Sequence, residues 1–327
     1  MTPSQLLENF SRLRVLVVGD IMLDHYVWGD VSRISPEAPV PVVLVERDSY
    51  TAGGAANVAH NLSALGLSVE LIGIVGDDEA GRRLCGLLAE NNVSAARCVV
   101  SSSAPTIMKT RVMARKQQVC RIDREGARGH YGHAAESELL PRVLEALATG
   151  VQAVIVSDYA KGGLNQVVLE GILAAAKRHG VLAAVDPKPA RKLNLTGVGL
   201  LTPNRHEALE LAGFPEPSVG EPYPLEAVCA RIYELFAPSL LVVTLGADGM
   251  ALSLGGRVEQ VIPTAAREVY DVSGAGDTVI ATLTAALAAG ADPVAAVHVA
   301  NHAAGVVVSK LGTAVVTAEE LRKELDR

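Results

Sequence analysis

The sequence predicts an α/β fold in which a mostly parallel central sheet is covered by helices on both faces. Short, continuous apolar runs recur along the 327 residues, and helical patterns lie between most of them. Strands that alternate with helices in this way form parallel sheets, because each helix crosses back over the sheet to the next strand. The composition agrees, since 49% of the residues are hydrophobic and 20% are charged. A chain of this length can build a large core, as one large domain or two smaller ones.

Six apolar runs are expected to form buried strands, at residues 14–19, 69–75, 151–156, 181–185, 198–201 and 240–245. Helical patterns cover residues 55–65, 79–90, 136–148, 165–179, 277–289, 292–309 and 317–326. Several of the strands end in Gly, Asp or Asn, namely at Gly19, Asp20, Asp158, Asp186, Asn204 and Gly246. Ligands of parallel sheets bind at the carboxyl ends of the strands, so these positions predict where a site lies.

Two stretches, residues 21–46 and 106–123, break the alternation of strands and helices. The first contains Pro36, Pro39 and Pro41, and the second alternates polar and apolar residues across an expected hairpin. Both are predicted to be strands of a small β-sheet that projects from the main domain as a lid. Such a sheet has one apolar face to cover. It is therefore expected to close on a ligand or to pair with a second subunit.

The composition also excludes some classes of function. The net charge of −7 provides no basic field for nucleic acid. The four cysteines lack metal-binding or redox spacing, and we expect reduced thiols in a cytosolic protein. The N-terminus has no signal-peptide pattern, and no apolar run is long enough for a membrane span. A soluble, cytoplasmic protein is expected.

The most informative motif is the segment 271–277, Asp-Val-Ser-Gly-Ala-Gly-Asp, which runs directly into an apolar helical pattern. Backbone N–H groups of Gly274, Ala275 and Gly276 at a helix start would form an anion site, favoured by the helix dipole. Asp277 in the first turn could accept a proton from an attacking hydroxyl. Phosphoryl transfer to an alcohol needs this pair of features. The alternative is an ordinary glycine-capped loop in which Asp277 only starts a helix.

Other phosphate and nucleophile motifs fail on this chain. The dinucleotide fingerprint lacks its third glycine, because Val279 stands at that position. No P-loop pattern occurs, and Asp271 replaces the first glycine that a nucleophile elbow around Ser273 would need. A nicotinamide-dependent dehydrogenase is therefore not predicted.

Three further motifs accompany the first. Gly53, Gly54 and Asn57 belong to a glycine-rich helix entry, where glycine permits close approach to a ligand and Asn57 can bond a hydroxyl. Asn204 and Glu207 open another helix, and Glu207 could orient a hydrated Mg²⁺. The loop 244–249 follows a strand and could support a nucleotide. Taken singly, these motifs are also explained as two helix starts and a hairpin.

In combination the motifs resemble the ribokinase-like, or PfkB, carbohydrate kinases. The N-terminal signature of that family is met by Gly53, Asn57, Ala59, Gly66 and Gly76, and the C-terminal signature by Asp271, residues 274–277 and Ala281. The family's N-x-x-E magnesium motif is present at 204–207, and one departure, Thr282, falls at a packing position. The resemblance covers essentially the whole chain and implies a single kinase domain over residues 1–327 with a lid.

Within that family, four strings resemble those of the D-glycero-β-D-manno-heptose 7-phosphate kinases: residues 19–24, 33–42, 157–162 and 186–188. This implies ATP-dependent phosphorylation of the anomeric C1 hydroxyl to give the 1,7-bisphosphate, for the ADP-heptose of lipopolysaccharide. Because the chain ends at Arg327, a kinase without a fused nucleotidyltransferase is expected. Alternatives are a ribokinase, fructokinase or phosphofructokinase type of enzyme, or a non-catalytic nucleotide-binding regulator.

The resemblance also implies roles for individual residues. Asp277, with an ordinary carboxyl pKa near 4, is the general base, and the amides of 274–276 hold the charge of the transferring phosphoryl group. The expected sugar contacts are Asp24, Gly53, Gly54 and Asn57, and the cations for the substrate's phosphate are Lys161, Lys188, Lys109 and Arg111. For ATP and Mg²⁺ the expected residues are Asn204, Glu207, Thr244, Gly246, Gly249 and Asn301, with Gly305 near the adenine and Glu207 reaching the metal through water.

Two expectations remain. His298 and His302 lie four apart on a helical pattern but lack a third metal ligand, so they are expected to be helix-surface or adenine-wall residues. The partners implied are a small sugar phosphate and a second copy of the chain, which pairs through the lid. Nucleic acid and membrane are not expected as partners.

Overall fold

The computed structural model describes residues 2–115, 117–127, 129–310 and 312–326. Over these residues nine strands form the main sheet, in the order β15-β14-β13-β12-β11-β10-β1-β4-β6. Pairing is parallel from β6 to β13, and β14 and β15 are antiparallel at the opposite edge. The strands are β1 (Arg14–Gly19), β4 (Ser68–Ile72), β6 (Val93–Ser94), β10 (Ala153–Ser157), β11 (Leu182–Asp186), β12 (Leu200–Leu201), β13 (Leu240–Thr244), β14 (Met250–Leu254) and β15 (Arg257–Ile262).

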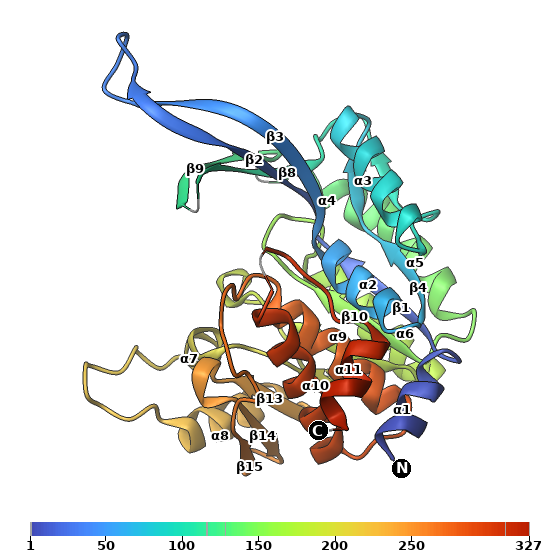
Figure 1. The fold of residues 1–327 in the computed structure, drawn as a ribbon. Helices are drawn as coiled ribbons and strands as arrows, with labels where there is room; N and C mark the ends of the chain where they lie inside the picture. Colours follow the sequence, from blue (N-terminus) through green and yellow to red (C-terminus); the bar gives the residue numbers. More distant parts are fainter. Residues whose placement is uncertain (1, 116, 128, 311, 327) are drawn as a thin grey trace.

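Helices cover both faces of this sheet (Figure 1). On one face lie α1 (Pro3–Phe10), α2 (Ala55–Ala64), α3 (Glu79–Glu90), α9 (Ala275–Ala288), α10 (Pro293–Val308) and α11 (Ala318–Leu325). On the other lie α5 (Leu140–Leu147), α6 (Gln166–His179), α7 (Arg205–Ala212) and α8 (Leu225–Phe236). Both faces of the sheet are apolar, as strand β1 shows. Its Val15 and Val17 pack into the hydrophobic core on one face, and Leu16 and Val18 pack into the core on the other. The predicted fold class is confirmed.

Some expected elements differ from the observed ones. The expected strand 69–75 is interrupted at Gly73, beyond which β5 (Ile74–Gly76) pairs with β7 (Val99–Ser101) in a separate small sheet. Here a Cβ would lie 2.8 Å from the carbonyl oxygen of Gly19, so the close approach requires glycine. The expected helix 136–148 follows the short α4 (Gly132–Ala134) and begins as a π-helical turn, Ala135–Leu139. Pro141, just inside α5, has no N–H to donate to the preceding turn.

A second sheet projects from the main body, as Figure 1 shows. We call it the lid sheet; its order is β3-β2-β8-β9, with β2 (Ile21–Ile34), β3 (Pro41–Gly54), β8 (Ile107–Ala114) and β9 (Gln117–Arg124). The sheet is mixed, because β2 and β8 are parallel and the other two pairs are antiparallel. Strand β3 is longer than expected and runs directly into α2. Lys116, within the predicted stretch 106–123, and the C-terminal Arg327 lie outside the described residues.

The carboxyl ends of the parallel strands meet at one edge of the main sheet. Gly19, Ser157 and Asp186 are neighbours in register at the ends of β1, β10 and β11. Strand β2 begins immediately after β1, so the lid sheet leaves from this same edge. The fold therefore places the lid over the strand ends where polar residues gather. Among the described helices, none has the length and apolar character needed to cross a membrane.

Candidate active site

Asp277 lies in the first turn of α9, directly after the glycine-rich segment. The residue before this helix, Gly274, has φ of +80°, which favours glycine. A Cβ at Gly274 would also lie 2.8 Å from Nδ2 of Asn57. At Gly276, by contrast, φ is ordinary and an added Cβ would meet nothing within 4 Å. The space beside Gly276 is therefore left open by the protein itself.

The buried carboxylate of Asp277 is held by two donors from different elements. Nδ2 of Asn57, on α2, donates to Oδ2 at 2.6 Å, and the hydroxyl of Tyr159 donates to Oδ1 at 2.5 Å. Burial raises the pKa of Asp277 to about 6, although both hydrogen bonds act to lower it. The carboxyl is thus a stronger base than the ordinary pKa near 4 predicts, because burial, which a sequence does not display, raises its pKa.

The contact between Asn57 and Asp277 is part of a polar seam between α2 and α9. Thr278 donates its hydroxyl to Oδ1 of Asn61 at 2.8 Å, and Nδ2 of Asn61 donates to the carbonyl of Asn57 at 2.9 Å. All four residues are buried. The seam joins the two glycine-rich motifs of the sequence into one site.

From the sequence, Asp20 was predicted only as a strand end near the site, and Tyr159 was given no role of its own. Buried Asp20, directly after β1, accepts hydrogen bonds from the backbone N–H groups of Tyr159, Lys161 and Gly163 at 2.9–3.0 Å. It therefore holds the loop after β10 against β1. An acidic residue after a buried strand was the available signal, but its partners lie about 140 residues away and no local pattern identifies them.

A polar hollow of about 180 Å³ lies beside Asp277. It is lined by Asp158, Tyr159, Asp186, Pro187, Lys188, Thr202, Asn204, Glu207, Thr244, Gly274, Gly276 and Asp277. Asn204 and Glu207 form a capping box at the start of α7, with bonds of 2.9 and 3.0 Å. Asn204 and Glu207 therefore do start a helix, as the alternative explanation of this motif predicted. The other oxygen of Glu207 accepts from Nζ of Lys188 at 2.8 Å and faces the hollow.

Acidic groups crowd this hollow. Burial raises the pKa of Asp186 well above its usual range, with contributions from the charges of Glu207 and Asp277. Burial likewise raises the pKa of Asp158 to about 6. Carboxylates held together in this way favour a cation between them. Within the described residues, no group of three or more His, Cys, Asp or Glu side chains could hold a metal ion directly. The arrangement fits a hydrated Mg²⁺ that is bound mainly by phosphates.

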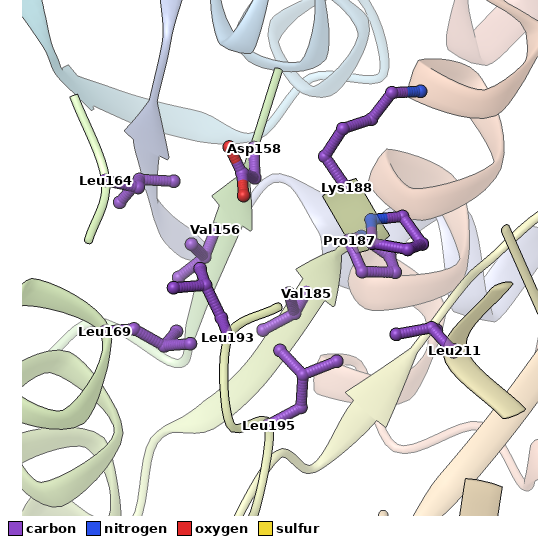
Figure 2. A pocket seen from close by; sticks show the side chains of 11 residues that line it. Val156, Asp158, Leu164, Leu169, Val185, Pro187, Lys188, Leu193, Leu195 and Leu211 are labelled. Carbon is purple, nitrogen blue, oxygen red and sulfur yellow. The ribbon is translucent and has the colours of Figure 1, made fainter. Parts of the chain in front are cut away.

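Lys188 stands at the rim of this hollow, one strand away from Asp158. Figure 2 shows both residues at the carboxyl ends of β10 and β11, with the side chain of Lys188 extending away from the leucines below. Those leucines, among them Leu193 and Leu195, pack under the strand ends. The apolar layer therefore supports the strand ends from which these two charged side chains project.

An apolar cavity of about 450 Å³ adjoins the hollow and shares Thr244 and Gly276 with it. Among its other lining residues are Gly246, Gly249, Val279, Asn301, Gly305 and Val308. The amide of Asn301 donates to the carbonyl of Pro263 at 2.6 Å and so positions the wall that follows β15. At Gly249, an added Cβ would lie 2.0 Å from the carbonyl oxygen of Ile262, so the hairpin itself requires glycine here. The cavity has the size and lining of a small-molecule site.

Basic side chains gather on the lid side of Asp277. Nη1 of Arg111 lies 2.5 Å from Oδ1 of buried Asp24, and Nζ of Lys109 lies 5.6 Å from the ring centre of Tyr159. Burial lowers the pKa of Lys109, as do the charges of Lys161 and Arg111. Concentrated positive charge of this kind attracts an anion.

Lys161 completes this group and forms an ion pair with Glu125. Gly53 and Gly54 lie close by, at the end of β3. Added Cβ atoms there would lie 2.5 Å from Oδ2 of Asp24 and 2.5 Å from the carbonyl of Asp20, respectively. The close approach that these two glycines permit is thus to the chain around β2.

His302 on α10 lies 3.9 Å from Glu324 through Nδ1. His298 lies one turn earlier on the same helix and is exposed. Neither residue lines the apolar cavity.

A sequence model described as pfkB family carbohydrate kinase matches residues 12–320. The chain belongs to this family. The predicted family and the predicted class of enzyme, a carbohydrate kinase, are confirmed. This family assignment accounts for the two glycine-rich motifs and for the carboxylate between them.

Curated relatives are similar to this chain over nearly all of its length. The bifunctional protein HldE of Magnetococcus marinus is 44% identical over 319 residues, which are 97% of this chain and 64% of that protein. HldE of Caulobacter sp. is 45% identical over 322 residues, or 98% of this chain and 64% of that protein. The chain therefore spans less than two thirds of the length of these relatives.

Solved structures share the fold. The ribokinase of Arabidopsis thaliana, complexed with ribose and ATP, has a TM-score of 0.76 at 20% identity, covering 96% of this chain and 99% of that one. Phosphofructokinase-2 of Escherichia coli, in complex with potassium, has a TM-score of 0.74 at 20% identity, covering 96% and 98%.

Proposed function

We propose that the protein is an ATP-dependent kinase that phosphorylates the anomeric C1 hydroxyl of D-glycero-β-D-manno-heptose 7-phosphate. The product is the 1,7-bisphosphate, a precursor of the ADP-heptose of the lipopolysaccharide core. The observation that carries the proposal is the position of the Asp277 carboxylate. It lies at the start of α9, beside the polar hollow that adjoins the apolar cavity, with the basic residues of the lid on its other side.

In this mechanism Asp277 accepts the proton of the C1 hydroxyl while the oxygen bonds to phosphorus and ADP leaves. The N–H groups of Gly274 and Gly276 stabilise the charge on the phosphoryl oxygens. The N–H of Ala275, which the sequence had also suggested for this role, already donates to the carbonyl of Val272 at 3.2 Å. The open space beside Gly276 supports this role, because it lets the phosphoryl group approach the backbone. When bound, ATP with Mg²⁺ supplies the phosphoryl group and the positive charge that neutralises it, next to Asn204 and Glu207. The apolar cavity suits the adenine.

The basic residues support a phosphorylated acceptor. Lys109, Arg111 and Lys161 lie near one another on the lid side of Asp277, and we assign them to the phosphate of the sugar. We assign Lys188 to the phosphates of ATP, because it contacts Glu207 in the polar hollow. This changes its assignment in the sequence analysis, where Lys188 was grouped with the cations for the sugar. The choice of a heptose rests on the four strings that resemble those of heptose 7-phosphate kinases, and the similarity to the HldE proteins is consistent with it.

The proposal is tested by an assay of ADP release with ribose, fructose 6-phosphate, unphosphorylated heptose and heptose 7-phosphate. The expected result is the highest kcat/KM with heptose 7-phosphate and a product phosphorylated at C1, identified by ³¹P NMR. Asp277→Asn should lower kcat by about 10²–10⁴-fold, the usual contribution of a general base. Higher kcat/KM with fructose 6-phosphate would assign the protein to the phosphofructokinase type. Absence of turnover with every sugar would favour a regulator.

We also propose that two copies of the chain pair through the lid sheet. Apolar side chains of this sheet and of the turn between β2 and β3 are exposed, namely Ile34, Val40, Leu44, Val45, Val119 and Ile122. Ile34 ends β2, Leu44 and Val45 belong to β3, and Val119 and Ile122 belong to the edge strand β9. Exposed apolar groups gathered on one sheet indicate a surface that a partner covers.

A further inference from the structure

We infer that Tyr159 is a positioning residue for the general base, which fixes the orientation of the Asp277 carboxylate toward the acceptor hydroxyl. The inference rests on the proposed function, since it gives Asp277 its role. It assigns a purpose to a residue that neither glycine-rich motif contains. Tyr159 acts through Asp277, and no contact between Tyr159 and a substrate is required.

The geometry of the two hydrogen bonds carries the inference. The Tyr159 hydroxyl donates to Oδ1 of Asp277 at 2.5 Å, while Asn57 donates to Oδ2 at 2.6 Å. Because each oxygen accepts from one donor, the carboxylate cannot rotate about the Cβ–Cγ bond of Asp277 without breaking one of these hydrogen bonds. Each oxygen keeps a further acceptor position for a substrate hydroxyl. Fixing a reacting group in this way lowers the entropic part of the barrier.

The backbone of Tyr159 is held as firmly as its hydroxyl. Its N–H donates to Oδ2 of Asp20 at 3.0 Å, and the next residue, Ala160, donates to Oδ1 of Asp158 at 2.8 Å. Ala160 has φ of +58°, a left-handed conformation that is unfavourable for alanine. Such a conformation persists only where its surroundings enforce it. The loop therefore presents the phenol of Tyr159 at a fixed position relative to β1.

The phenol remains a neutral donor at physiological pH. Burial raises the pKa of Tyr159 well above its usual value, and the negative charge of Asp277 adds to this. Besides the neutral donors Tyr159 and Asn57, charged groups influence Asp277, namely Asp24 on β2, Lys109 on β8 and Asp186 at the end of β11. Of these, only Lys109 favours the carboxylate over the acid, and it belongs to the lid sheet. Tyr159 thus provides a stabilising contact that does not depend on the lid.

The test is Tyr159→Phe, which removes only the hydroxyl. Two measurements are made: the pH dependence of kcat, and the titration of the Asp277 carboxyl by ¹³C NMR without substrate, with Asp277→Asn to identify its signal. We expect kcat to fall about tenfold. The pKa from the pH dependence of kcat and the pKa from the NMR titration should both rise by about one pH unit, because the lost hydrogen bond stabilised the charged carboxylate. KM for ATP should change less than twofold.

Tyr131→Phe is the matched control. Tyr131 is buried, whereas Tyr159 is partly buried, and the Tyr131 hydroxyl donates to the carbonyl of Pro105 at 2.7 Å. This variant should lose stability but keep the wild-type pH dependence. If Tyr159→Phe also unfolds at lower temperature, 3-fluorotyrosine at position 159 preserves the size and donates more strongly, and the NMR titration should then shift to lower pH.

An unchanged carboxyl titration in both position-159 variants would overturn the inference. This outcome is separable from a failure of the proposed function, because the NMR titration needs no turnover. If wild-type protein phosphorylates no sugar while the titration still shifts, the function is wrong and the positioning contact stands. If Asp277→Asn retains full activity, the base role itself is lost.

Discussion

The side-chain amide of Asn57 donates to Asp277 across 2.6 Å and joins two motifs that lie 220 residues apart in the chain. Asn57 sits in the first turn of α2 and Asp277 in the first turn of α9, so two helix starts meet at one carboxylate. The bond partly offsets the unfavourable burial of the charge. This relationship leads to the first prediction.

The stability of the Asp277→Asn variant, compared with that of wild type, should be greater at neutral pH than at acidic pH. In wild type the pKa of Asp277 is raised in the folded state, from 3.8 to about 6. Folded protein therefore holds the proton more tightly, and wild type loses stability as pH rises from about 4 to 6. This loss amounts to about 3 kcal/mol, from 1.36 kcal/mol per unit. Asparagine does not titrate, so the variant lacks the loss.

The measurement is urea unfolding of both proteins at pH 4, 5, 6 and 7. The free energy of unfolding of the variant, minus that of wild type, should increase with pH and level off above about 6. A difference independent of pH would mean that Asp277 has an ordinary carboxyl pKa. Glu259→Gln, on the exposed side of β15, serves as the control.

The second prediction contrasts two glycines that are two residues apart. Gly276→Ala should preserve or slightly raise the melting temperature, because its Cβ enters open space in a helix, where alanine is favoured by about 1 kcal/mol. Its activity should fall at least tenfold, through KM for ATP, kcat or both, since that space is needed by the phosphoryl group. Gly274→Ala should lower the melting temperature, because its φ is +80° and Asn57 is in the way. Full activity in Gly276→Ala would contradict the proposed binding of the phosphoryl group at the open space beside Gly276.

The third prediction separates the basic residues by substrate. Lys161→Ala should raise KM for the sugar phosphate about tenfold or more and leave KM for ATP unchanged, since a hydrogen bond to a charged group contributes about 1.5–3 kcal/mol. Lys188→Ala should raise KM for ATP by a similar factor, because it pairs with Glu207. The exposed Lys177, at the end of α6, is the control. If Lys188→Ala instead affects only the sugar phosphate, Lys188 binds the acceptor.

The fourth prediction concerns the lid sheet. Leu44→Glu should weaken a dimer that forms through the lid, because Leu44 is 72% exposed on β3 and a charge there opposes burial in an interface. Light scattering during gel filtration at several concentrations measures the change. Val219→Glu, in the exposed loop before α8, provides the control. Wild-type protein that is monomeric at high concentration would exclude the proposed pairing.

The elements that the sequence predicts well are those with a local cause. Runs of apolar residues such as 14–19 form buried strands because both of their faces are covered. The π-helical turn before α5 and the interruption at Gly73 were not predicted. They depend on a single missing N–H and on the close passage of another strand, which periodicity does not report.

The residues of the candidate site also divide into those that the sequence predicts and those that it does not. Motifs indicate Asp277, Asn57 and Glu207, because the spacing of residues at a helix start is visible in the sequence. The contact of Tyr159 with Asp277 spans 118 residues, and no local pattern reports it. The raised pKa of Asp277 could not be predicted either, since it arises from burial by elements distributed over the chain.

Strand β3 passes into α2 at Gly54 without an intervening loop, and Asn57 follows within one helical turn. The projecting strand and one of the two donors to Asp277 therefore belong to one continuous segment of the chain. A displacement of β3 that reached Gly54 would change the distance from Asn57 to the carboxylate. Tyr159, which donates to the other carboxylate oxygen, follows β10 of the main sheet and is held there by Asp20. The two hydrogen bonds on the proton acceptor are thus linked to different parts of the fold, one to the lid sheet and one to the main sheet.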